Sequence, residues 1–206
     1  MYPVTVHIET ALAHRNRLTT AFRLILALPH LILVGGAGLG FASGGDSRTT
    51  LGSEGGLLGA VAGFLAIVSW FTIVIAATHI VGIRQFTAFY LRWRVRAASY
   101  LMLLQDAYPP FGDASYPASI EIIDPPSRRR LTVALRLILA IPHLFVLAFV
   151  LLAWGLTTIV AWFSILFTGA YPQGLYEFGV GVLRWRLRVE AYLLLMVDEY
   201  PPFSLT

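Results

Sequence analysis

The sequence has no cysteine and no lysine, and few charged residues of any kind. Without cysteine, the chain can form no disulfide, no thiolate nucleophile and no cysteine-based metal site. Charged residues make up 13% of the 206 residues and hydrophobic residues 57%, whereas soluble domains are roughly 45–50% apolar. This balance predicts an integral membrane protein. The net charge of +4 is carried by arginines beside apolar runs, which favours membrane lipid over nucleic acid as a partner.

One apolar stretch is present twice. Residues 17–34 read RLTTAFRLILALPHLILV, and residues 130–147 read RLTVALRLILAIPHLFVL. Arginine and histidine are seven residues apart in both copies, about two helical turns, so the two side chains share one helix face. The equivalent residues are Arg23 and Arg136, Pro29 and Pro142, and His30 and His143.

A second stretch is also repeated, but at a different offset. Residues 91–111 match residues 183–203 at an offset of 92, whereas the first stretch repeats at an offset of 113. The second copy therefore lacks 21 residues between its two conserved parts. We divide the chain into two tandem repeats, 1–112 and 113–206. Each begins with a short alternating segment after a Tyr-Pro pair, which predicts a β-strand, and the two strands are expected to pair.

The apolar runs predict four membrane spans. In the first repeat, spans over 19–41 and 57–81 are joined by a Gly- and Ser-rich loop over 42–56. Residues 131–170 have one charged residue, Arg136, and 40 residues suffice for two crossings of about 20 residues each. We therefore predict a second, tight hairpin that turns near Trp154-Gly155.

An amphipathic helix is expected after each hairpin. Residues 82–106 and the matching segment of the second repeat carry apolar residues at alternating steps of three and four, with arginines on the remaining positions. This pattern is typical of a helix in the membrane interface, or of an ordinary helix packed on protein. The predicted fold is all-α integral membrane, with two transmembrane hairpins, two interfacial helices and short strands at the repeat starts.

The distribution of arginine predicts the orientation. Arginines outside the spans are concentrated before the first span, between the hairpins and after the last span. The positive-inside rule then places both termini in the cytoplasm. Two hairpins of the same orientation are related by a pseudo-twofold axis along the membrane normal.

Arg23 and Arg136 are the first candidate functional residues, because an arginine within an apolar span is costly. Each can extend to lipid phosphates, form an intramembrane ion pair, or line a transport path. Asp106 and Asp198, at matching positions, are the candidate carboxylate partners.

His30 and His143 are candidate ligands of one haem iron or metal ion. Each can equally bond a backbone carbonyl that the neighbouring proline leaves free. The structural role is favoured, because no carboxylate or third ligand lies at ligand spacing nearby.

A further set of residues suits anionic lipid headgroups, or simple anchoring at the cytoplasmic surface. These are Arg92, Arg96, Arg184 and Arg188, with Trp93 and Trp185.

Two runs carry a resemblance to a known family: R-L-I-L-A-x-P-H, and R-W-R-x-R followed by D-x-Y-P-P-F. They resemble the bacterial, largely actinobacterial, membrane proteins grouped as domain of unknown function 4389, here as two tandem copies. The resemblance implies a multi-pass protein of the bacterial cytoplasmic membrane. It carries no activity and no catalytic residues.

No nucleophile motif, no paired acidic site within a span and no phosphate-binding loop is present, so we expect a protein that is not an enzyme. The first hypothesis is an accessory or scaffold subunit of a membrane complex that also binds anionic lipid. Its partners would be lipids and other membrane subunits or a second copy, and no cofactor is required. The alternatives are a small transporter or channel with a path on the pseudo-twofold axis, and a bis-histidine haem protein.

Overall fold

The computed structural model describes residues 2–37, 55–112, 114–124 and 129–206, and it is mostly helical with one small sheet. The first repeat contains β1 (Val4–Ile8), α1 (Arg17–Ala21), α2 (Arg23–Val34), α3 (Gly56–Ala76) and α4 (Val81–Leu101). The second contains β2 (Ala118–Ile122), α5 (Arg130–Ala134), α6 (Arg136–Thr168) and α7 (Gln173–Leu193).

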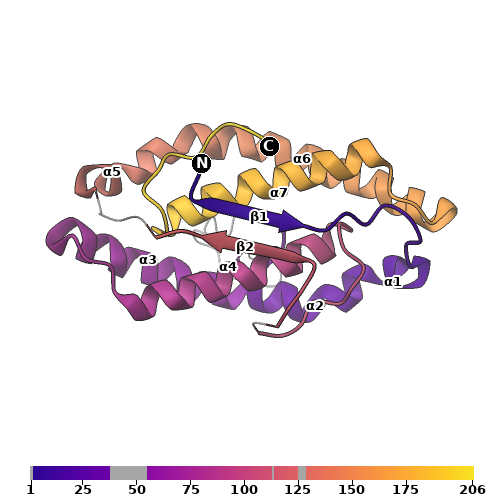
Figure 1. The fold of residues 1–206 in the computed structure, drawn as a ribbon, viewed down its shortest axis with the longest axis horizontal. Coiled ribbons are helices and arrows are strands. Elements are labelled where there is room, and N and C mark those ends of the chain that lie inside the picture. Colours follow the sequence, from indigo (N-terminus) through magenta and orange to yellow (C-terminus); the bar gives the residue numbers. More distant parts are fainter. Residues whose placement is uncertain (1, 38–54, 113, 125–128) are drawn as a thin grey trace, which may run out of the picture.

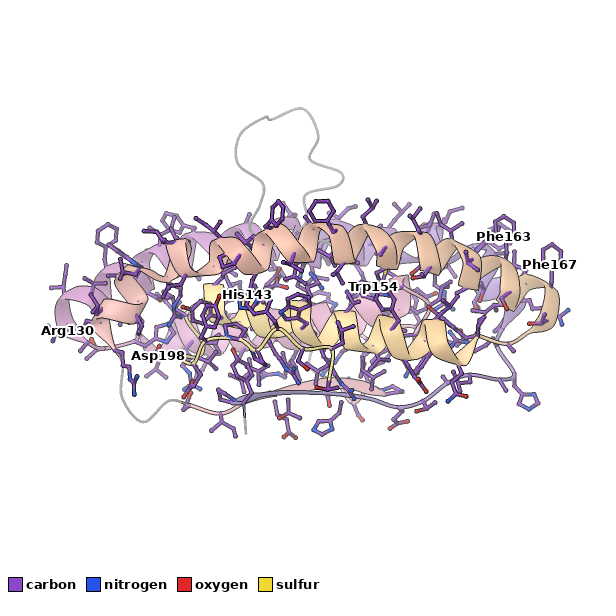
Figure 2. All side chains as sticks on the ribbon, turned by 90° about the horizontal axis from the view of Figure 1, so that it is seen from above. Arg130, His143, Trp154, Phe163, Phe167 and Asp198 are labelled. Carbon is purple, nitrogen blue, oxygen red and sulfur yellow. The ribbon has the colours of Figure 1, made fainter. Side chains whose placement is uncertain are left out.

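The elements form three layers. The α1–α2–α3 and α5–α6 segments form one outer layer, α4 and α7 lie beneath them, and the sheet covers the other side of α4 and α7 (Figures 1 and 2). The buried core lies between these layers, and most of α7 from Gly179 onward is inaccessible to solvent.

The predicted strands at the repeat starts are confirmed, and they pair. β1 and β2 are antiparallel, with Val6 opposite Ile120. Alternate residues of each strand face α4 and α7, so Val6 and Ile120 are buried while His7 and Glu121 point to solvent.

The predicted hairpin over 131–170 is wrong. α6 is one continuous helix of 33 residues, and Trp154 and Gly155 lie in its middle. The physical reason is that no residue in the segment ends a helix: Pro142 lies in the first third and leaves the helix intact, and the run contains no cluster of turn-forming residues. α3 and α6 are each long and apolar enough to cross a membrane, by length and composition alone.

The expected first span is also not a single helix. α1 ends at Ala21, α2 follows after Phe22 and ends at Val34. The far end of that span and most of the loop expected over 42–56 lie outside the described residues. The segment expected as the second span is helical and forms α3, which ends five residues earlier than the expected 81.

α2 and α3 together correspond to α6. Both pair with the same helix: Arg23 and His30 of α2 contact Tyr100 and Trp93 of α4, and Gly59 of α3 meets Tyr90 farther back along α4. α2 and α3 therefore run in one direction, antiparallel to α4. α6 pairs with α7 in the same register, with contacts from Arg136 to Tyr192 and from His143 to Trp185.

The two repeats pack against each other in opposite directions (Figure 1). The Trp70 indole of α3 donates to the carbonyl of Val133 in α5 at 3.0 Å. The Trp162 indole of α6 donates to the carbonyl of Thr20 in α1, also at 3.0 Å. Because equivalent residues make equivalent contacts across the interface, a pseudo-twofold axis relates the repeats and runs perpendicular to the long helices.

Candidate functional site

Arg23 and Arg136, the arginines of the two apolar runs, each form an ion pair within their own repeat. Arg23 Nη2 lies 2.7 Å from Asp106 Oδ1, and Arg136 Nη2 lies 2.9 Å from Asp198 Oδ1. Both guanidinium groups are buried, and each also stacks on a tyrosine ring of the returning helix. The structure thus brings together the arginines and carboxylates that the sequence analysis named, and it joins the start of each long helix to the end of the helix that returns beneath it.

Asp106 also pairs with a second arginine, Arg15, which the sequence analysis missed. Arg15 donates to Asp106 at 2.9 Å, and the Asn16 N–H donates to the same carboxylate. Burial acts to raise the pKa of Asp106, but the hydrogen bonds from Arg15, Asn16 and Arg23 outweigh it and hold the pKa below its usual value near 3.8. In the second repeat, the Arg129 N–H takes the place of Asn16 at Asp198.

The two histidines are buried and are held by tryptophan. The Trp93 indole donates to His30 Nδ1 at 3.0 Å, and the Trp185 indole donates to His143 Nδ1 at 3.2 Å. Because Nδ1 accepts, the neutral ring carries its proton on Nε2. Each imidazole also stacks on a phenylalanine of the Y-P-P-F run, with ring centroids 4.6 Å apart for Phe111 and 3.9 Å for Phe203.

These contacts correct the interpretation of the aromatic stripe. α4 and α7 do not lie at an open interface: Trp93 and Trp185 are buried against protein, so they contact histidine rather than lipid. Three of the four arginines expected to bind lipid instead donate to backbone carbonyls. Arg184 donates to the Val6 carbonyl of β1, Arg188 to the Thr206 carbonyl, and Arg96 to the Gly112 carbonyl. Arg92 is partly exposed on the same helix.

A buried charged cluster joins the repeats at their interface. Arg94 donates to Glu190 at 2.9 Å, the Tyr90 hydroxyl donates to Glu190 at 3.0 Å, and Arg186 lies 3.3 Å from the same carboxylate. Arg94 also donates to the Val34 carbonyl at the end of α2, where a cation is favoured. Sequence analysis missed this cluster, although Glu190 follows Arg186 by four residues, a spacing that places both side chains on one helix face.

The outer surface of the long helices is apolar along its whole length. Large hydrophobic side chains of α2, α3 and α6 point away from α4 and α7 and are exposed, with Phe167 at 77% and Ile75 at 72% (Figure 2). We call this surface the apolar face. It is defined by Leu24, Ile25, Leu28, Ile32, Phe64, Ile67, Phe71, Ile75, Leu137, Ile138, Ile141, Phe145, Phe149, Leu152, Leu156, Ile159, Phe163 and Phe167.

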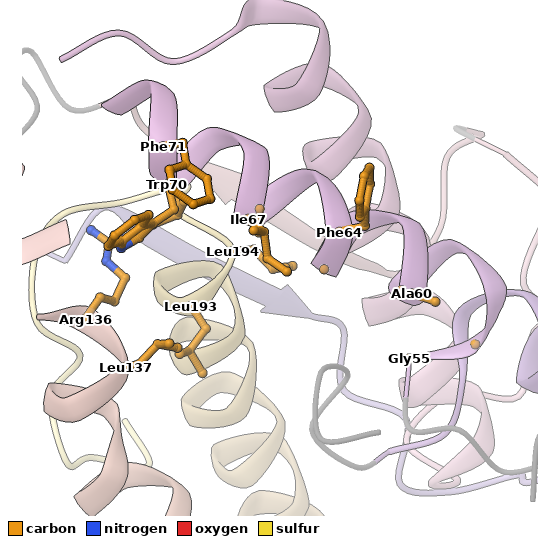
Figure 3. A pocket seen from close by; sticks show the side chains of 15 residues that line it. Gly55, Ala60, Phe64, Ile67, Trp70, Phe71, Arg136, Leu137, Leu193 and Leu194 are labelled. Carbon is orange, nitrogen blue, oxygen red and sulfur yellow. The ribbon is translucent and has the colours of Figure 1, made fainter. Parts of the chain in front are cut away.

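A groove opens between α3 and the start of α6. It has a volume of about 660 Å³, with α3 along one side, Arg136 and Leu137 on the other, and Leu193, Leu194 and Leu195 beneath (Figure 3). Arg136 is the charged residue of its lining. We call it the α3–α6 groove. In the described part of the chain, no three His, Asp or Glu residues cluster as a metal site would require.

These features define a class of protein: a two-repeat helical protein with one broad apolar face and a small sheet on the opposite side. The chain belongs to the family described as Domain of unknown function (DUF4389), whose model matches residues 55–112 and 130–204. No curated protein and no solved structure matches the chain.

Proposed function

We propose that this chain is a membrane protein that lies flat in one leaflet of the bacterial cytoplasmic membrane, with the apolar face in the hydrocarbon. The observation that carries the proposal is the separation of the two broad surfaces. Exposed apolar side chains gather on the outer side of α2, α3 and α6, and the sheet with its exposed His7 and Glu121 lies on the opposite side. Such a two-sided distribution is typical of interfacial membrane binding.

Crossing the bilayer would be unfavourable for this fold. α6 is about 50 Å long at 1.5 Å per residue, against a hydrocarbon thickness of about 30 Å. The sheet runs along the same direction as α6, beneath it (Figure 2). If α6 crossed the membrane, the open edges of β1 and β2 would enter the hydrocarbon, where open sheet edges do not occur.

The flat arrangement also suits the symmetry and the charge. With the long helices in the membrane plane, the pseudo-twofold axis perpendicular to them lies along the membrane normal. Both termini then lie on the polar side of the layer. We place that side in the cytoplasm because the net charge of +4 suits the anionic cytoplasmic leaflet.

In function, we propose an accessory or scaffold subunit that is not an enzyme. The polar side, built from the sheet and the chain ends, is available to bind another membrane subunit, while the apolar face fixes the protein in the leaflet. A transport path is not favoured. Arg23 and Arg136 begin α2 and α6 at opposite ends of the molecule (Figure 1), and each is paired within its own repeat.

A haem site is not favoured either. His30 and His143 each accept a hydrogen bond from a tryptophan of their own repeat and lie flat against a phenylalanine of their own repeat. An axial ligand to a shared iron would have to leave this aromatic enclosure.

Single-cysteine labelling tests the flat arrangement, because the chain has no cysteine of its own. Leu131→Cys and Thr168→Cys mark the two ends of the α5–α6 segment, and Glu121→Cys marks the sheet. We expect a membrane-impermeant maleimide to label all three in inverted membrane vesicles and none in intact cells. Labelling of Leu131→Cys and Thr168→Cys from opposite sides would show that α6 crosses the membrane and would overturn the proposal.

A fourth variant, Phe149→Cys, serves as a depth control. Phe149 is 62% exposed in the middle of the apolar face, so its thiol should react only after detergent is added. The scaffold role is tested by native mass spectrometry of protein gently extracted from its own membranes. A complex with other subunits is expected, and a bare monomer or homo-oligomer would argue against that role.

A further inference from the structure

We propose that the α3–α6 groove binds one acyl chain of an anionic phospholipid, with the headgroup held near Arg129 and Arg130 at the start of α5. The inference rests on the proposed function, because the lipid reaches the groove from the leaflet in which the apolar face lies. The proposed function requires only that the apolar face contacts the membrane. A lipid in the groove would in addition be a specific ligand that stays bound after extraction.

The shape and chemistry of the groove suit a hydrocarbon chain. Its volume of about 660 Å³ is in the usual range of about 300–1,000 Å³ for small-molecule sites. Leu193–Leu195 line it beneath, and small residues of α3, such as Gly59, Ala60 and Gly63, line one side. The groove offers a long chain an apolar surface and few groups that would demand a hydrogen bond.

Comparison of the repeats shows that the groove is a property of α3. Gly59, Ala60 and Ala66 line it. The matching residues of α6, at an offset of 92, are Leu151, Leu152 and Thr158. These larger side chains would fill the equivalent space beside α6. The groove is therefore specific to the first repeat and is not repeated by the pseudo-symmetry of the fold.

The groove is continuous with the apolar face. Phe64, Ile67 and Phe71 line it, and each of these side chains is more than half exposed on the membrane-facing surface (Figure 3). An acyl chain can therefore enter the groove from the leaflet without passing through water. This avoids the unfavourable exposure of its apolar surface to water.

Charge at one end favours an anionic headgroup. Arg136 lines this end of the groove and is bound to Asp198, and the same carboxylate accepts from the Arg129 N–H at 3.1 Å. This places Arg129 and Arg130 beside that end of the groove, and both residues are exposed. Arginine binds phosphate well because its planar guanidinium presents several N–H donors.

The test measures lipid retention by the full-length protein in detergent, using native mass spectrometry with added phosphatidylglycerol or phosphatidylcholine. We expect one retained phosphatidylglycerol per chain. Gly63→Phe should weaken retention at least tenfold, because Gly63 lines the groove and a Cβ there meets no atom within 4 Å. Gly155→Phe is the matched control: it is the equivalent glycine of α6, it also has open space at Cβ, and it does not line the groove.

Two further variants keep the test decisive. Ala60→Leu introduces the residue that α6 carries at the equivalent position, and it should weaken retention even if Gly63→Phe fails to fold. Arg129→Gln with Arg130→Gln should reduce phosphatidylglycerol retention to the level of phosphatidylcholine. Equal lipid retention by wild type, Gly63→Phe and Ala60→Leu would overturn the proposal that the groove binds the acyl chain. Displacement of the lipid by millimolar inorganic phosphate alone would show that the protein has only a phosphate site.

Vesicle flotation separates this inference from the proposed function. If wild-type protein floats with phosphatidylglycerol vesicles but retains no lipid after extraction, the groove proposal fails and the membrane placement stands. If wild-type protein neither floats nor retains lipid, both fail. Flotation of Gly63→Phe at the wild-type level, with loss of the retained lipid, is the result we expect.

Discussion

The backbone of Gly56 lies directly against the backbone of Leu33, although 22 residues separate them in the chain. A Cβ added to Gly56 would lie 2.7 Å from the Leu33 carbonyl oxygen, and Gly56 has a φ of +63°. The end of α2 and the start of α3 therefore meet. In the second repeat, Leu147 and Ala148, the equivalents of Val34 and Gly56, are consecutive within α6. The two repeats thus share one architecture, with 21 extra residues in the first.

This relationship predicts that residues 35–55 can be deleted. Joining Val34 to Gly56 should give one continuous helix equivalent to α6, because the matching register with α4 is already present. We expect the shortened protein to fold, with a melting temperature within about 5 °C of wild type, a shift that corresponds to roughly 1–2 kcal/mol. Circular dichroism and thermal melting in detergent provide the measurement.

A deletion of the same length that removes residues 144–164 from α6 is the control. It takes away Leu147, Trp154 and Ala161, which are fully buried, and it should abolish folding. Aggregation of both deletion variants alike would argue against the shared architecture.

The ion pairs of the two arginines should contribute strongly to stability. Asp198→Asn leaves Arg136 buried beside a neutral side chain, and removal of one partner of a buried pair costs about 3–5 kcal/mol. Asp106 is more exposed than Asp198, and Asp106→Asn should cost less, about 2–3 kcal/mol. Thermal melting in detergent gives both values.

Asp124→Asn is the matched control for these variants. Asp124 pairs with Arg84 at the surface, where such pairs contribute about 0–1 kcal/mol. A loss of stability in Asp124→Asn equal to that in Asp198→Asn would show that burial does not determine the effect.

Stability should fall in acid through Asp106. Its pKa in the folded protein lies below the usual value near 3.8, so the folded state binds fewer protons than the unfolded state near that pH. The contribution is complete above the unfolded pKa and is lost as the pH falls from about 4 toward the folded pKa. The difference in melting temperature between wild type and Asp106→Asn should therefore shrink between pH 5 and pH 3, as measured in a pH series. A constant difference would exclude Asp106 as the titrating group.

The sequence predicted the repeat, the strands and the partners of Arg23 and Arg136, because each depends on local pattern or on equivalent positions. It did not predict the direction of the helices. Residues 131–170 are apolar throughout, and such a run fits either two short crossings or one long helix. The choice depends on the helix alongside: α7 pairs with α6 from Arg136 to Trp154, and no turn can interrupt that contact.

The sequence also did not predict that α4 and α7 are packed against protein. An apolar stripe flanked by arginines has the same pattern whether it faces lipid or protein. Whether the helix faces lipid or protein depends on carbonyl and carboxylate partners from distant segments. Val6 is such a partner for Arg184, and Glu190 is one for Arg94. Glu190 has no acidic counterpart in the first repeat, where Ala98 occupies the matching position, so the repeat comparison did not reveal it.

The tryptophan–histidine pairs give the last prediction. Trp93→Phe and Trp185→Phe remove the indole N–H that His30 and His143 accept, whereas Trp154→Phe removes an equal volume from a buried indole. Within the described residues, the N–H of Trp154 has no hydrogen-bond partner. Because a net hydrogen bond contributes about 0.5–1.5 kcal/mol and an unsatisfied buried acceptor costs more, Trp93→Phe and Trp185→Phe should destabilise the protein by about 1–2 kcal/mol more than Trp154→Phe. Thermal melting of the three variants decides the matter: equal losses would mean that the indoles stabilise through packing alone.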